Sequence, residues 1–154
     1  MIKTIENLVA EHPMFRELDA AHRTLIAGCG RNRSFADGEL LMREGDPADE
    51  FFAIRHGTVT LYLQDAQRGE IAIQSLGPGQ IVGLSWLFPP YRVQFDARAI
   101  GPVNTISFDG ACLRGKCDAD PEFGYALMKR LAATMTHRLQ ATRMQLLDVY
   151  GPQT

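Results

Sequence analysis

Turn-forming residues recur through the middle of the chain, about 8–12 residues apart, as in a small barrel, sandwich or roll. Short apolar runs lie between the turns, and those at residues 59–63 and 71–73 alternate with the period of a half-buried strand. The turn signals are Asp37-Gly38, Glu44-Gly45-Asp46-Pro47, His56-Gly57, Arg68-Gly69, Gly77-Pro78-Gly79, Gly101-Pro102 and Asp109-Gly110. The pattern predicts a roll of β-strands over residues 34–110.

One segment of this β region, residues 76–99, is rich in glycine and then in aromatic residues. No charged side chain occurs between Glu70 and Arg92, and a membrane span would need about 20 apolar residues. The segment is instead broken by glycines and by Pro89-Pro90, which a helix does not tolerate. We therefore expect a buried loop-and-turn segment. The backbone N–H groups of glycine-rich turns can converge on an anion, so it is a candidate phosphate cradle.

Helical patterns flank the β region on both sides. Residues 4–12 and 16–28 carry short apolar faces, and Asp19 is placed to cap the second helix. Asp120-Pro121 reads as an N-cap followed by proline at the first helical position, and it opens a long helix. We expect a single domain over residues 1–154. Its parts are N-terminal helices in 1–30, the roll in 34–110 with a cassette at 76–99, and the long helix in 120–150.

The long helix carries two apolar stripes. The first has the alternating spacing of three and four that is typical of a helix pairing with another helix, and it predicts a homodimer through residues 128–149. Its members are Met128, Ala132, Met135, Leu139, Thr142, Leu146 and Val149. The second stripe, Phe123, Leu127 and Leu131, is expected to pack back on the β part. The alternative is that both stripes belong to the core of one domain.

Composition and motifs narrow the function classes. A formal net charge of −2 gives no overall attraction to nucleic acid. Glu6 and Glu11 occupy the region where a signal peptide needs an uncharged core, so we expect a cytoplasmic protein. The four histidines lie far apart in the sequence, and no Ser-His-Asp, Walker or Rossmann pattern occurs. We therefore expect a protein that is not an enzyme.

The three cysteines are a second candidate functional site, besides the phosphate cradle. Their odd number argues against a disulfide framework. Cys112 and Cys117 flank two basic residues, and nearby cations lower a thiol pKa, so this pair is a candidate redox-sensitive site. With Cys29 they are also candidate ligands for zinc or an iron–sulfur cluster, although no close C-x-x-C pair occurs. Burial as ordinary core residues is the third interpretation.

The order of elements resembles the sensor domain of the Crp-Fnr family and, more broadly, the cyclic-nucleotide-binding domain. The supporting motifs are Arg43-Glu44-Gly45-Asp46, residues 52–59, residues 76–83, Asp120-Pro121 and residues 138–142. The resemblance implies a mainly β fold with flanking helices. It is a jelly-roll-like β-roll, or double-stranded β-helix, with a long C-terminal dimerisation helix. Crp-Fnr regulators continue into a helix-turn-helix, which this sequence lacks. We expect a stand-alone sensor with no DNA-binding domain and no membrane segment.

The resemblance also assigns candidate ligand-binding residues. Nucleotide-binding members place a glutamate after the cassette glycine for the ribose hydroxyl, and an arginine about ten residues later for the cyclic phosphate. Here Leu84 follows Gly83, and Val93 stands in the arginine position with Arg92 one place earlier. Two lost charged hydrogen bonds cost roughly 3–6 kcal/mol, or on the order of a hundred- to ten-thousandfold in affinity. The cassette is therefore degenerate unless Arg92 or Arg98 substitutes. The candidate set is Gly83, Leu84, Ser85, Arg92, Val93, Arg98, Thr142 and Arg143.

We predict a non-enzymatic, ligand-sensing regulatory module for signal transduction. Its effector would be a small molecule, with cAMP and cGMP as the candidates, and Thr142 would read the base. One alternative is a ligand-free structural or dimerisation subunit that docks onto a larger redox or regulatory complex through residues 86–91. Residues 86–88 have two interpretations, roll core or the lining of a different pocket. Another alternative is a cysteine-based redox sensor. The sequence does not name the protein partner.

Overall fold

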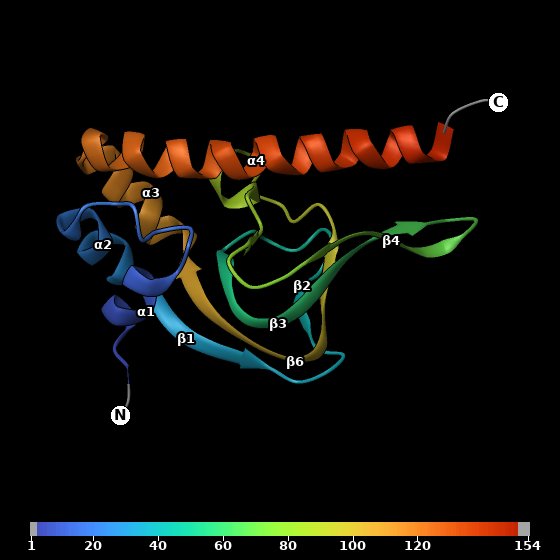
Figure 1. Ribbon diagram of the computed structural model, residues 1–154, viewed down its shortest axis with the longest axis horizontal. Helices are drawn as coiled ribbons and strands as arrows, with labels where there is room; N and C mark the ends of the chain where they lie inside the picture. Colours follow the sequence, from blue (N-terminus) through green and yellow to red (C-terminus); the bar gives the residue numbers. More distant parts are fainter. Residues whose placement is uncertain (1–2, 151–154) are drawn as a thin grey trace.

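Two long strands, β3 (Glu50–Asp65) and β6 (Asp96–Asp109), form the centre of the computed structural model, which describes residues 3–150. They pair antiparallel from Glu50 opposite Asp109 to Tyr62 opposite Asp96. β1 (Gly30–Phe35) and β4 (Gly69–Leu76) extend the sheet in the order β1-β6-β3-β4, while β2 (Leu40–Met42) pairs with β6 and β5 (Ile81–Val82) with β3. All pairs are antiparallel. Figure 1 shows the bent sheet, which confirms the predicted β-roll.

Glycines bend both long strands at places where the sequence indicates turns. Gly57 (φ 98°) lies within β3, at register shifts around His56, and Gly101 (φ 76°) lies within β6. A bulge keeps the strand going but increases its twist and bends it. The expected turns at His56-Gly57 and Gly101-Pro102 are therefore wrong. The same positive-φ glycines let β3 and β6 curve together into a roll.

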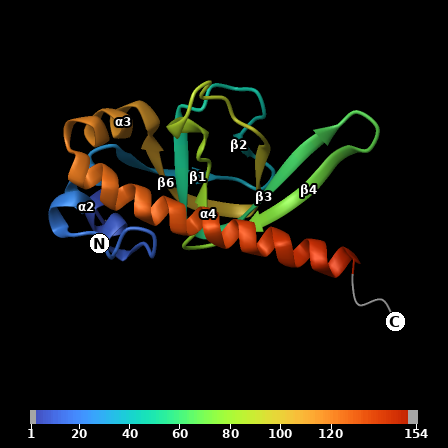
Figure 2. The same cartoon turned by 90° about the horizontal axis from the view of Figure 1, so that it is seen from above.

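Short helices gather at one end of the roll (Figure 2). α1 (Ile5–Glu11) and α2 (Ala20–Ala27) lie within the predicted segments, and Asp19 caps α2 by accepting the His22 N–H at 2.8 Å. α3 (Gly110–Ala119) was not expected, because Asp109-Gly110 reads as a turn. Asp109 instead caps this helix by accepting the Cys112 N–H at 2.8 Å.

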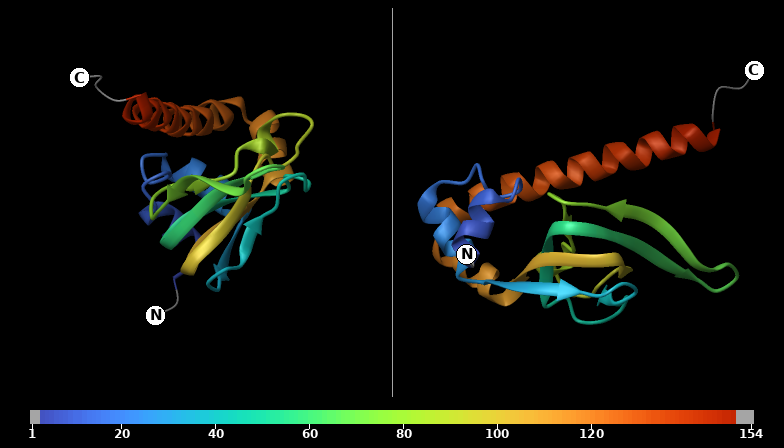
Figure 3. Two further views of the ribbon diagram at one scale, coloured as in Figure 1. Left: turned by 90° about the vertical axis from the view of Figure 1, so that its right-hand side faces the viewer. Right: turned by 60° about the horizontal axis from the view of Figure 1, so that its bottom comes forward.

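The long helix α4 (Pro121–Tyr150) begins at the predicted Asp120 cap and passes along the roll (Figures 1 and 3). Its stripe of Phe123, Leu127 and Leu131 is fully buried, as predicted. The predicted pairing seam is exposed from Ala132 onward, with Met135 41% and Leu139 52% accessible, whereas Met128 is half-buried against the core. No helix in residues 3–150 combines the length and the apolar character needed to cross a bilayer.

Apolar side chains form two cores. One lies where the helices meet the sheet and contains Phe15, Phe51, Trp86, Leu113 and the buried stripe of α4. The other fills the inside of the roll and contains Phe35, Phe52, Val59, Leu61, Leu76, Val82, Val93 and Ala97. The cassette contributes to both cores, because Ile81 and Trp86 belong to the helix-side core whereas Leu76, Val82 and Val93 belong to the core inside the roll.

Candidate functional site

The cassette begins with a glycine that its backbone requires. Gly83 has φ 95°, and a Cβ at this position would overlap the side chain of Met42 from β2. Leu84 comes next and packs against the helix-side core, and Ser85 opens a short 3-10 helix, η1 (Ser85–Leu87). The side chain that follows Gly83 is thus apolar and directed at the helices.

Trp86 anchors this part of the cassette in the core. Its ring stacks on Phe51 with centroids 5.1 Å apart, and the Arg114 guanidinium donates to its carbonyl at 2.5 Å. Leu87 packs on the same core, whereas Phe88 is 63% exposed beside the cis Pro89–Pro90 bond. Trp86 and Leu87 are therefore core residues, but they belong to the helix-side core rather than to the predicted roll core, and Phe88 belongs to neither core.

Val93 and Arg92 face opposite ways, as neighbours on extended chain do. The Val93 side chain is 6% exposed and belongs to the core inside the roll. Its backbone pairs with the 45–46 turn, donating to the Asp46 carbonyl at 2.9 Å and accepting from the Gly45 N–H at 2.8 Å. Arg92 is exposed. The structure thus has the valine, rather than the arginine, at the inward position.

Arg98 is held by an acid two strands away. Its guanidinium makes two hydrogen bonds to the Glu70 carboxylate, at 2.7 and 2.9 Å, and lies over the Tyr62 ring at 4.9 Å. The hydrogen bonds to Glu70 raise the pKa of Arg98 and lower the pKa of Glu70. The Arg98 charge is therefore already matched on the surface of the sheet.

Thr142 and Arg143 lie on the exposed C-terminal half of α4. The Thr142 hydroxyl donates to the Arg138 carbonyl of its own helix at 3.0 Å. Gly83, Leu84 and Ser85 are thus placed together by the chain itself, while Arg92, Thr142 and Arg143 are exposed on other segments and Arg98 is paired with Glu70.

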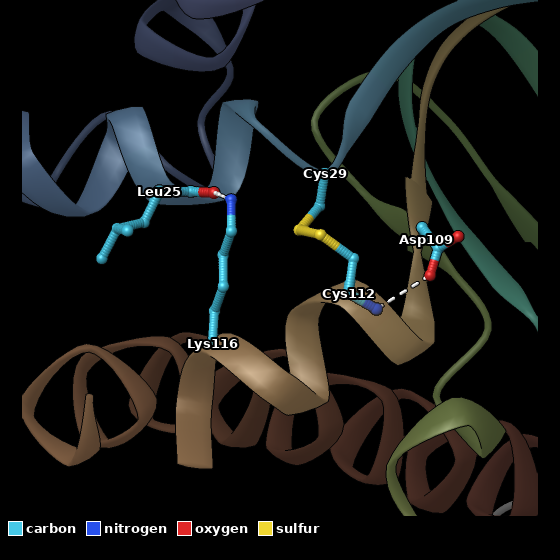
Figure 4. Close-up of a disulfide and its surroundings, with 5 residues drawn as sticks. All are labelled: Leu25, Cys29, Asp109, Cys112 and Lys116. Atoms are coloured by element: carbon cyan, nitrogen blue, oxygen red, sulfur yellow. Dashed lines mark hydrogen bonds between the residues drawn. A yellow bond between two sulfur atoms is a disulfide. The ribbon is translucent and has the colours of Figure 1, made fainter. Parts of the chain in front are cut away.

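The cysteines pair differently from the predicted arrangement. Cys29 and Cys112 form a disulfide with a Cα–Cα distance of 5.8 Å (Figure 4), and Cys117 is free. Cys29 follows α2 directly and enters β1. β1 pairs with the end of β6, where the Asp109 N–H donates to the Cys29 carbonyl at 2.9 Å. Cys112 lies in the first turn of α3, which follows β6 directly. Cys117 is five positions further along α3, and residues five apart on a helix point in different directions.

The predicted reactive Cys112/Cys117 pair is therefore wrong, and so is its electrostatic basis. Lys116 donates to the Leu25 carbonyl at 2.7 Å, and Arg114 lies over the Tyr91 ring at 4.4 Å. Burial, with nearby acids adding to it, raises the pKa of the Cys117 thiol. The disulfide also occupies two of the three candidate metal ligands. In residues 3–150 no three His, Cys, Asp or Glu side chains are grouped so that they could hold a metal ion.

Comparisons with known proteins agree with this fold. The sequence model of the family described as "Cyclic nucleotide-binding domain" matches residues 32–120. A Geobacter metallireducens GS-15 protein, provisionally described as cyclic nucleotide-binding, superposes with a TM-score of 0.77 at 30% identity, covering 90% of this chain and 99% of that one.

Two curated relatives are similar over parts of their length. The Drosophila melanogaster cAMP-dependent protein kinase type II regulatory subunit is 33% identical over 81 residues, which is 53% of this chain and 21% of that protein. The Mycobacterium tuberculosis CRP-like cAMP-activated global transcriptional regulator is 28% identical over 115 residues, which is 75% of this chain and 50% of that protein. The chain spans half or less of the length of these two relatives. The predicted Crp-Fnr resemblance is confirmed, and the chain belongs to the cyclic nucleotide-binding domain family.

Proposed function

We propose that the chain is a non-enzymatic, ligand-sensing regulatory module that acts as a homodimer and passes its state on through α4. The observation that carries the proposal is the division of α4 into two faces. Leu127 and Leu131 are fully buried against the chain, whereas Met135 and Leu139 are largely exposed on the seam. A helix anchored on one face and free on another can couple a change at the roll to a contact with a second subunit.

A second copy of the chain is the best-fitting occupant of the seam. The seam keeps its heptad spacing from Met128 to Val149, and such spacing lets identical helices pair through the same positions. Leu146 and Val149 extend the exposed apolar surface towards the end of the helix. Contiguous apolar surface of this kind marks an interaction site.

The effector in this proposal is a small molecule, with cAMP and cGMP as the first candidates. Both curated relatives carry cAMP in their descriptions. Gly83 and Ser85 would offer backbone and hydroxyl groups, Arg92 a cation, and Thr142 with Arg143 would reach the base from the paired helices. The cassette is degenerate, because Leu84 offers no acceptor and Val93 fills the inward position. We therefore expect affinity on the order of a hundred- to ten-thousandfold below that of a complete cassette.

Titration calorimetry with cAMP and then cGMP tests the nucleotide role. We expect micromolar to millimolar binding, weakened by Arg92→Ala and Thr142→Ala and unchanged by Lys129→Ala, which removes a different cation from α4. Arg98→Ala also breaks the pair with Glu70, so its thermal unfolding must be measured alongside. No heat at millimolar concentrations of both nucleotides would rule out this role. It would leave a structural subunit docking through residues 86–91, where Phe88 is exposed.

The Cys29–Cys112 disulfide favours a second candidate function, a cysteine-based redox sensor. The bond ties the end of α2 to the first turn of α3, which packs against α4. Both cysteines line a surface pocket of about 460 Å³, which gives a small reductant access. We expect a cytoplasmic protein, and disulfides there are usually transient and redox-sensing.

Thiol labelling in glutathione buffers tests the redox role. A sensor requires that Cys29 and Cys112 are labelled together at a cytosolic glutathione ratio and are protected after treatment with diamide. The measurement is made in Cys117→Ser, which removes the free thiol, so that labelling reports Cys29 and Cys112 alone. A bond that persists in reduced glutathione would make the disulfide structural.

A further inference from the structure

A second cavity lies between the roll and α4, and it includes Gly79 and Gln80 from the start of the cassette but none of Gly83, Leu84 or Ser85. Its volume is about 300 Å³, and its lining comes from residues 13–14, from 74–80 and from α4 between residues 130 and 141. We propose that this cavity binds the anionic group, phosphate or carboxylate, of a small organic molecule, with Arg138 as the principal cation. The site does not depend on whether the cassette binds a nucleotide.

Arg138 occupies a row of α4 that faces the rest of the chain. It follows Leu131 by seven positions, and residues seven apart lie on the same face of a helix. Leu127 and Leu131 in the same row are fully buried. The sequence therefore puts a permanent positive charge where the row would continue with an apolar side chain.

Two of the three guanidinium nitrogens of this half-buried arginine have no hydrogen-bond partner in the described part of the chain. Within residues 3–150, the Nε and Nη2 atoms of Arg138 are buried and make no hydrogen bond. Burial also lowers the pKa of Arg138, although an arginine stays charged at neutral pH. Buried charges in proteins are normally paired and hydrogen-bonded, because the lost hydration must be replaced. Arg138 therefore has unused capacity for an anion.

Arg130, a second arginine of this cavity, differs from Arg138 because each of its three guanidinium nitrogens donates a hydrogen bond. Its Nε donates to the Met14 carbonyl at 3.0 Å, its Nη2 to the Pro13 carbonyl at 3.1 Å, and its Nη1 to Glu17 at 3.2 Å. No aspartate or glutamate from residues 3–150 lines the cavity. The chain thus satisfies one arginine of this cavity and leaves the other without an acid.

The rest of the lining suits an organic anion. His137 and Gln74 add polar groups, while Met14 and Ala141 offer apolar contact. A guanidinium binds phosphate and carboxylate through paired hydrogen bonds. The volume is at the lower end of the range for small-molecule sites. None of the α4 residues that line the cavity is a member of the seam.

The Arg138 Nε–H resonance provides a direct readout. We would record nitrogen–proton NMR spectra of the arginine side chains, assign this signal by its loss in Arg138→Gln, and titrate with sodium phosphate, sodium acetate, cAMP and cGMP. Sodium chloride at matched ionic strength is the blank. We expect a saturable shift with at least one anion, and the phosphate and acetate arms identify its class.

Matched variants separate binding from folding. When the anion that shifts the Arg138 signal is added, the melting temperatures of the wild type and of Lys129→Gln should rise by the same amount. The melting temperature of Arg138→Gln should not change. Calorimetric affinity should fall at least tenfold in Arg138→Gln. Because Arg138→Gln removes a half-buried, unpaired charge, it should unfold no earlier than the wild type in chloride. An equal response of wild type and Arg138→Gln to every probe would overturn the proposal. Nucleotide binding to the cassette should be intact in Arg138→Gln, because Gly83, Leu84 and Ser85 do not line this cavity. A failure of the nucleotide role would therefore leave the Arg138 site untouched, and a failure of the Arg138 site would leave the nucleotide role in place.

Discussion

His12 is a buried histidine whose two ring nitrogens have different roles. Its Nδ1 accepts the Met14 N–H at 3.1 Å, and its Nε2 lies 2.9 Å from the Ile54 carbonyl oxygen. A carbonyl can only accept, so Nε2 carries the hydrogen and the ring is neutral. Burial lowers the pKa of His12, an effect that the Ile54 carbonyl opposes and Arg55 increases. A proton on Nδ1 would displace the Met14 N–H.

The free energy of unfolding should therefore rise with pH between the lowered pKa of His12 and its ordinary value of 6.5. In that window the unfolded chain binds a proton that the folded chain does not. The stabilisation is complete above pH 6.5 and is lost as the pH falls through the folded pKa. Urea unfolding across about pH 5–8 measures this slope. His12→Gln should flatten it, and the exposed His56→Gln should not. An unchanged slope in His12→Gln would show that another group titrates.

Single residues differ in how well the sequence predicts their surroundings. The burial of Phe123, Leu127 and Leu131 follows from helical spacing, which is a local property. The pairing of Arg98 with Glu70 does not, because β3 lies between their two strands and only the register of the sheet brings them together. Arg138 could have been noticed as a charge in the row of Leu131, but its lack of a partner depends on the folded surroundings.

At the scale of elements, local signals predict where a helix begins better than what a glycine does within a strand. Asp19 and Asp120 mark the starts of α2 and α4 by their capping side chains. Asp109 carries the same signal for α3, but the glycine that follows it also suits a turn. Gly57 is likewise ambiguous, since turns and bulges both use positive φ. Only the continuous pairing of β3 with β6 selects the bulge.

Replacing the two bend glycines by alanine should have unequal effects. At Gly57 a Cβ would collide with the Pro102 carbonyl of β6, whereas at Gly101 it would meet open space. Both variants bear the strain of positive φ, on the order of 1–2 kcal/mol. Gly57→Ala should therefore lower the free energy of unfolding more than Gly101→Ala, as chemical denaturation would measure. Equal losses would mean that the bulge adjusts without strain.

At the scale of the whole molecule, the seam of α4 predicts the assembly state. The wild-type chain should sediment as a dimer at micromolar concentration, and Leu139→Asp should sediment as a monomer, because an aspartate in the seam would be buried without a partner. Gln140→Asp introduces the same charge at the next, exposed position of the helix and should remain dimeric. A wild type that sediments as a monomer at high micromolar concentration would contradict the proposed homodimer.

The disulfide predicts a stability change for the whole chain. Cys29 and Cys112 are 83 positions apart, and closing a long loop restricts the unfolded chain. Cys29→Ser should lower the free energy of unfolding by about 2–4 kcal/mol. A reductant should destabilise the wild type by a similar amount and have little effect on Cys29→Ser. Cys117→Ser is the matched control and should keep its response to reductant. If reduction leaves the wild-type denaturation curve unchanged, the bond does not contribute to stability.

The same bond makes the roll a covalent ring with helices attached at its junction. All six strands lie between Cys29 and Cys112, while α1 and α2 leave the ring on one side and α4 on the other. A single backbone cut at the exposed hairpin tip near Arg68 would therefore not release a fragment. The nicked chain would run as one species on a denaturing gel until the disulfide is reduced, and as two species afterwards. Separating α1 and α2 from α4 would then require both a backbone cut within the ring and reduction of the disulfide.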